Sequence, residues 1–222
     1  MPDFASIQSL QSNLIRKFIT GSVFVTNDLD DALPARLTDA TGDPIALTGA
    51  WEDLGMLSED GAQFASDTTV SDTTAWQSVE PARSDLVSKS NTLAVACRET
   101  KRATIEAYTG KDLSEVTAAP GGAIVFDDDA TPTFRFARVL AIGADLAAEG
   151  GPIYFGRGLH RARVTAVDDQ AINKGDDGLP WGVTFSGFVD PVAKSSQRWY
   201  FEGPGWNYAL AAAGFAPAAT TP

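Results

Sequence analysis

Short runs in which apolar and polar residues alternate, separated by glycine and proline, constrain the fold of this chain more than any other feature. The clearest run is "LPWGVTFSGFVD" (179–190). Its apolar face carries Trp181, Val183, Phe185 and Val189. The opposite face carries Thr184 and Ser186, and a bend is expected at Gly187. Because a period of two residues is typical of a half-buried strand, this run predicts a strand that contributes to a core.

Six further stretches have the same texture, so the chain is expected to be mainly β. They are "GSVFVT" (21–26), "TLAVACRE" (92–99), "GAIVFDD" (122–128), "TFRFARVLAIG" (133–143), "LHRARVTAVDD" (159–169) and "SSQRWYFEG" (195–203). In the last stretch Trp199 and Phe201 alternate with Tyr200, and Trp199 is expected to point into the core, as Trp181 does. Polar loops are expected between the strands, at 26–44, 66–76, 127–132 and 173–180.

One short helix is expected at about 100–109, within "ETKRATIEAYTG". Thr100 is the predicted N-cap, and Gly110 is predicted to end the helix in a left-handed conformation. A helix this short is stable only when it packs against a sheet. The expected organisation is a single domain over residues 1–210, followed by a flexible C-terminal tail at 211–222, where Ala, Thr and Pro predominate.

The charge balance excludes several classes of partner. The formal net charge is −12, with 17 basic and 29 acidic residues, and this disfavours binding to nucleic acid or to anionic membranes. No signal peptide is expected from "MPDFASIQSLQSNLIRKFI", and no run is long and apolar enough for a membrane span. The single cysteine, Cys97, is interpreted as a small core residue, which is typical of a protein that folds in a reducing compartment.

No catalytic, cofactor-binding or metal-binding residues are predicted, and no cofactor. The single histidine, His160, cannot build a histidine zinc site and is expected to start a strand. The G-x-G of "YFGRGLHR" (154–161) lacks a strand–helix context and is interpreted as a hairpin turn. "FDDDATP" (126–132) and "NKGDDGLPW" (173–181) lack calcium-loop spacing. Paired carboxylates and a sugar-binding face of Trp and Tyr remain open alternatives.

Several motifs in the N-terminal half, taken in order, resemble the major tail tube proteins of long-tailed, siphovirus-type phages, especially those that infect actinobacteria. The motifs are "NLIRKFITGSVFV" (13–25), "ALP" (32–34), "WEDLGMLSEDG" (51–61), "DTTAWQS" (72–78), "PARSD" (81–85) and "LAVACRETKRATIEAYTG" (93–110). The resemblance covers most of residues 13–110. Beyond residue 120 it rests on strand texture and on "WYFEG" (199–203). In "WEDLGMLSEDG", Trp51, Leu54 and Leu57 are expected to anchor the segment, and Glu59–Gly61 to form a turn. These apolar residues fill either the monomer core or a subunit interface, and the core is favoured for Trp51.

The resemblance implies a β-sandwich or barrel with one helix, and a structural role without enzymatic activity. Copies of the chain would form hexameric rings that stack into a hollow tube, and DNA would pass through its acidic lumen without specific binding. The implied partners are other copies, the tape measure protein, and the tail terminator and tip proteins. The implied location is the virion tail, reached after assembly in the host cytoplasm. The alternative is a monomeric β-sandwich that binds or hydrolyses glycans.

Overall fold

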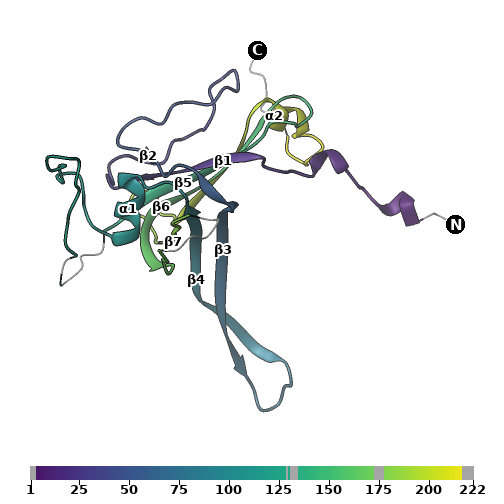
Figure 1. Ribbon diagram of the computed structural model, residues 1–222. Helices are drawn as coiled ribbons and strands as arrows, with labels where there is room; N and C mark the ends of the chain where they lie inside the picture. Colours follow the sequence, from purple (N-terminus) through teal and green to yellow (C-terminus); the bar gives the residue numbers. More distant parts are fainter. Residues whose placement is uncertain (1–3, 129, 131–134, 173–177, 217–222) are drawn as a thin grey trace.

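The computed structural model describes residues 4–128, 130, 135–172 and 178–216. Within them, eight strands form one antiparallel sheet in the order β2–β1–β5–β6–β7–β4–β3, and β8 also pairs with β6 (Figure 1). The strands are β1 (Thr20–Thr26), β2 (Glu52–Asp53), β3 (Leu57–Thr74), β4 (Pro81–Cys97), β5 (Ala137–Asp145), β6 (Ile153–Val167), β7 (Trp181–Gly187) and β8 (Gln197–Glu202). The helices in these ranges are η1 (Phe4–Ile7), η2 (Ser12–Leu14), α1 (Arg102–Thr109) and α2 (Pro204–Ala209).

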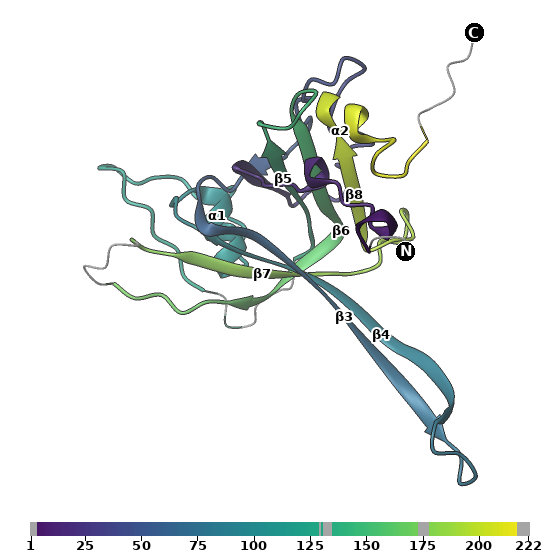
Figure 2. The ribbon, with the colours of Figure 1, turned by 90° about the vertical axis from the view of Figure 1, so that its right-hand side faces the viewer.

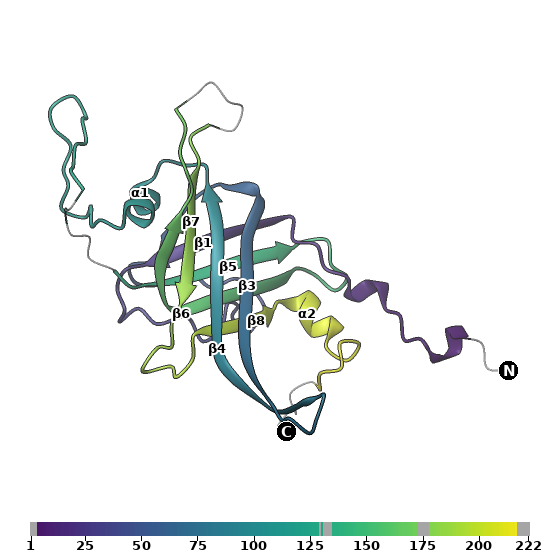
Figure 3. The ribbon, with the colours of Figure 1, turned by 90° about the horizontal axis from the view of Figure 1, so that it is seen from below.

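Strand β6 joins two layers because its two halves have different partners. Its first half, Tyr154–Leu159, pairs with β8, and its second half, from Ala162 to Val167, pairs with β7. Figure 3 shows β1, β5 and β8 running steeply across β3, β4 and β7. The sheet therefore folds over on itself into a sandwich of two crossed layers, which confirms the predicted mainly-β fold class.

The core lies between the two layers and is closed at one end by α1. Val23, Val139 and Leu159 come from one layer, and Leu93, Val183 and Phe185 come from the other, all almost fully buried. Cys97 belongs to the same cluster, as predicted. Thr104 of α1 donates a hydrogen bond to the carbonyl oxygen of Leu54 at 3.1 Å, and Gly110 ends the helix with φ +72°.

A second cluster lies on the outer face of the first layer, beneath the segment 27–51. Leu33 and Leu37 reach down onto Leu140 and Tyr200. They fit because β6 presents two glycines there. A Cβ at Gly156 would lie 2.5 Å from Leu37 Cδ1, and one at Gly158 would lie 2.7 Å from Leu33 Cδ1. The stretch "YFGRGLHR" is thus part of a strand, and its prediction as a hairpin turn was wrong.

Four other expectations need correction. Residues 66–74 belong to strand β3 and are not a loop. Residues 122–128 do not form a strand: no partner strand is found for them in the described residues, and Ile124 and Val125 are exposed. The N-cap of α1 is Lys101; Thr100 instead accepts a hydrogen bond from Trp181 Nε1 at 3.2 Å. Glu59–Gly61 is a bulge inside β3, not a turn, since the register shifts between Leu57 and Ala62.

The predicted alternation in β8 is correct, but its faces are reversed. Tyr200 is buried and donates a hydrogen bond to the carbonyl oxygen of Pro34 at 2.7 Å, whereas Trp199 is 48% exposed. The helix α2, which follows β8 directly, was not predicted. Leu54 is buried, as its anchoring role requires, and Trp51 packs half-buried against the second cluster. The predicted flexible tail at 211–222 lies partly outside the described residues.

Candidate assembly surfaces

Histidine and thiol side chains are sparse in the described part of the chain. Within it, no group of three or more His, Cys, Asp or Glu is placed to hold a metal ion. Burial raises the pKa of the Cys97 thiol to about 11, which suits an inert core thiol. The two stretches that were compared with calcium loops lie partly outside the described residues. In the same part of the chain, no helix is long and apolar enough to cross a membrane.

His160 lies in the middle of β6 and not at a strand start. It is buried, and its backbone carbonyl accepts a hydrogen bond from Arg138 Nη1 at 2.8 Å. Arg138 Nη1 also lies 3.5 Å from Asp190 Oδ2. Burial, and then the positive charge of Arg198, lowers the pKa of His160. The His160 imidazole is therefore neutral at pH 7, and it lies beside the buried contact between Arg138 and Asp190.

A His160→Gln variant is expected to be less sensitive to mild acid than the wild type. Because folding lowers the pKa of His160, the unfolded chain takes up a proton first as the pH falls below about 6.5, and the folded state loses stability. The wild type should lose more folding free energy than the variant between pH 7 and pH 5.5, by at most about 1 kcal/mol. Urea unfolding at both pH values measures this difference, and equal losses would show that His160 does not titrate on unfolding.

A cavity of about 700 Å³ lies beneath α1, and two of the carboxylates that line it already have partners. Glu106 accepts hydrogen bonds from Leu113 N at 3.0 Å and from Asn27 Nδ2 at 3.2 Å. Asp112 pairs with Arg135 at 3.0 Å, and its hydrogen bonds with Ser114 lower its pKa. A carboxyl group whose pKa is lowered is a poor general acid, so Asp112 does not suit that role in glycoside hydrolysis.

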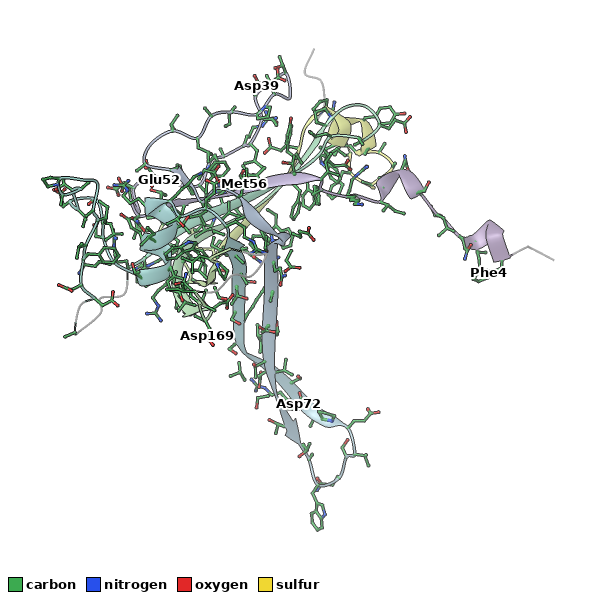
Figure 4. The ribbon with its side chains drawn as sticks, in the orientation of Figure 1. Phe4, Asp39, Glu52, Met56, Asp72 and Asp169 are labelled. Atoms are coloured by element: carbon green, nitrogen blue, oxygen red, sulfur yellow. The ribbon has the colours of Figure 1, made fainter. Side chains whose placement is uncertain are left out.

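The outer part of the β3–β4 hairpin, residues 65–90, projects from the body as a two-stranded ribbon, here called the hairpin arm (Figures 1 and 2). Every residue in it except Ala75 is exposed. Its exposed apolar side chains are Val70, Trp76, Val79, Leu86 and Val87, and Figure 4 places Asp72 along it. An isolated two-stranded ribbon is marginally stable in water, so contacts with another chain would stabilise the hairpin arm.

Six aromatic rings form a continuous row across β6, β8 and α2, here called the aromatic stripe. Phe18 stacks on Phe155 at 5.4 Å, Phe155 contacts Trp199 and Phe201, and Phe201 contacts Trp206 at 5.1 Å. Phe215 ends the row, 5.9 Å from Trp206. Trp199, Phe201 and Phe215 are each about half exposed. An apolar patch of this kind on a protein surface indicates an interaction surface.

The N-terminal arm, residues 4–17, leads away from this stripe. Phe18 anchors its root, because Phe18 lies against Gly143 as well as on Phe155. Phe4, Ile7, Leu10 and Ile15 are all exposed along it, and Figure 4 shows Phe4 at its far end, remote from the body. Residues 4–15 contain no charged side chain.

The whole chain exposes far more surface than a compact monomer of its mass. Its accessible surface is 14670 Å². A folded monomer of 23.4 kDa is expected to expose about 9,700 Å². Because a standard interface buries about 800 Å² on each partner, the excess of about 5,000 Å² is enough for several subunit contacts.

A family model for the phage tail tube protein matches residues 8–208. The chain belongs to the phage tail tube protein family. This confirms the resemblance seen in the sequence and places the tail tube subunit in the virion tail, as a structural component. A solved structure titled as the tail of an empty GTA particle with C6 symmetry is similar at 13% identity, covering 67% of this chain and 85% of that chain, with a TM-score of 0.32. No curated protein matches.

Sequence reasoning missed both principal surfaces of the tail tube subunit. The sequence predicts a loop for residues 66–76, which form part of the hairpin arm, although their Thr and Val content is a weak strand signal. Trp199 was assigned to the core, because alternation separates two faces without saying which one is covered.

Proposed function

We propose that the chain is a non-catalytic building block of the phage tail tube. Copies form rings, hexameric as the sequence resemblance implies, and the rings stack into a hollow conduit for DNA. The observation that carries the proposal is the surface excess of about 5,000 Å². The hairpin arm and the N-terminal arm contribute to it and expose apolar side chains in a lone subunit. Family membership supports the same role.

The partners follow from that role. Other copies of the chain cover the hairpin arm and the open strand edges, since β3 ends the sheet on one side and β2 pairs with only two residues of β1 on the other. The tape measure protein would fill the tube during assembly in the host cytoplasm, and the terminator and tip proteins would close its ends.

The acidic balance suits a conduit for DNA. A lumen with many Lys and Arg would bind phosphates and retard the duplex, whereas an acidic one repels it. The segment 27–51 carries Asp28, Asp30, Asp31, Asp39 and Asp43. Hydrogen bonds from Thr41 and Asp43 lower the pKa of Asp39, so this group stays ionised at neutral pH. Lysines in place of acids on a mapped inner wall should leave tubes intact but slow DNA ejection.

Negative-stain microscopy of the purified protein at rising concentration tests the proposal. We expect rings or tubes with an open channel. Compact monomers at every concentration would contradict it. The alternative, a glycan-binding module, is favoured by one observation, the half-exposed Trp199. It predicts a stable monomer whose tryptophan fluorescence changes on titration with glycans.

A further inference from the structure

The aromatic stripe lies on the same face of β6 as the buried core, but the second layer of the sandwich does not extend over it. Phe155 and Leu159 lie on the same face of β6, and Leu159 is fully buried beneath the second layer. Arg157 lies between Phe155 and Leu159, at the boundary between the part of this face that β3 covers and the exposed part. Its guanidinium lies 4.4 Å from the ring of Phe64 on β3 and 4.0 Å from the ring of Trp199 on β8. Beyond Trp199, the stripe faces solvent.

The N-terminal arm starts at the stripe but runs away from it, beyond α2 (Figure 3). Fourteen residues span at most about 45 Å when extended, so the arm reaches well past the body of its own subunit. It carries apolar side chains that nothing in the described chain covers. The same end of the molecule therefore offers an uncovered apolar face and an uncovered apolar segment.

We propose that the N-terminal arm of one copy lies on the aromatic stripe of the next copy. The proposal rests on the proposed function, and it names the contact between neighbouring subunits. The surface excess of about 5,000 Å² on one chain is roughly six times the 800 Å² that each partner buries in a standard interface, which leaves area for this contact besides that of the hairpin arm.

Charge favours the N-terminal arm over the hairpin arm as the occupant. Residues 4–15 are uncharged, so they can cover aromatic rings without desolvating a charge. The hairpin arm carries four acids, Asp67, Asp72, Glu80 and Asp85, and burying such carboxylates on an apolar stripe is costly. Because the N-terminal arm and the aromatic stripe are different surfaces of the chain, a contact between them is head-to-tail. Such contacts close into rings or continue as filaments, as a tube requires.

Cysteine pairing between two separate proteins tests the contact. A Leu10→Cys protein is mixed with a Phe215→Cys protein under assembly conditions and oxidised; the native Cys97 is fully buried and does not interfere. The control partner is a Val125→Cys protein, whose exposed site lies in the segment 111–128 at the opposite end of the subunit. Docking raises the effective concentration, so the disulfide between the arm and the stripe should form about tenfold faster than the control.

A second measurement uses no cysteine. Changing Phe4, Ile7 and Leu10 together to Ser should raise the critical concentration for assembly about tenfold or more, while Gln8→Ser with Gln11→Ser should leave it unchanged. If wild-type tubes form and neither effect appears, the contact is wrong although the proposed function stands. Faster pairing of Phe215→Cys with Trp76→Cys than with Leu10→Cys would make the hairpin arm the occupant and would also overturn the proposal. If the wild type never assembles, the proposed function itself fails.

Discussion

A variant whose hairpin arm is replaced by a tight turn should fold normally but remain a monomer. Asp67 pairs directly with Ser90, so residues 68–89 can be exchanged for Asn-Gly, which closes a two-residue hairpin at that point. The removed residues are all exposed except Ala75, and the core residues of β4 begin beyond them, at Leu93. The thermal midpoint should therefore stay within a few degrees of the wild type.

The same change should abolish assembly, because it removes the longest surface that other copies are proposed to cover. Static light scattering over a range of concentrations would measure the loss. A matched control keeps the ribbon but alters only its tip, with Trp76→Ser and Val79→Ser, and should weaken assembly without abolishing it. Wild-type assembly by the shortened chain would show that the hairpin arm is not an assembly element.

An Arg138→Leu variant should lose about 3 kcal/mol of folding free energy. Arg138 is buried, and it donates hydrogen bonds to the carbonyl oxygens of Leu29 and His160 while lying 3.5 Å from Asp190. Removing it leaves the buried Asp190 carboxylate without its positive partner, which typically costs 3–5 kcal/mol. The lower end applies because Val192 N and Ala193 N still donate to Asp190, each at 2.8 Å.

Arg36→Leu is the matched control for Arg138→Leu. Arg36 lies 3.8 Å from Glu202, but its side chain is 62% exposed, and exposed ion pairs contribute less than about 1 kcal/mol. Differential scanning calorimetry should show a fall in the melting temperature of about 6–12 °C for Arg138→Leu and little change for Arg36→Leu. Similar shifts for both variants would mean that the buried ion pair does not stabilise the fold.

The sequence predicted the segments in which one face of a strand is buried. The alternation of Trp181, Val183 and Phe185 exists because β7 lies across the core, and Gly110 ends α1 as expected. The hairpin arm could not be found in this way. Neither of its faces is buried in one subunit, so nothing imposes a hydrophobic period on it.

Other features depend on contacts between distant parts of the chain. Tyr200 is buried and Trp199 exposed because the segment 27–51 covers one face of β8, while the other face is open to solvent at Trp199. Gly156 and Gly158 suit a turn as well as a strand until Leu33 and Leu37 are seen to occupy the space above them. Local pattern cannot supply these long-range contacts.

Hydrogen exchange on assembled and unassembled protein measures whether copies of the chain cover the surface that one copy leaves bare. If the account is right, backbone amides in residues 65–90 and 4–17 exchange at least about tenfold more slowly in assemblies than in monomers, because covered ribbons open less often. Amides of the core strand β7 should change little. Equally fast exchange of both arms in well-formed tubes would contradict the account.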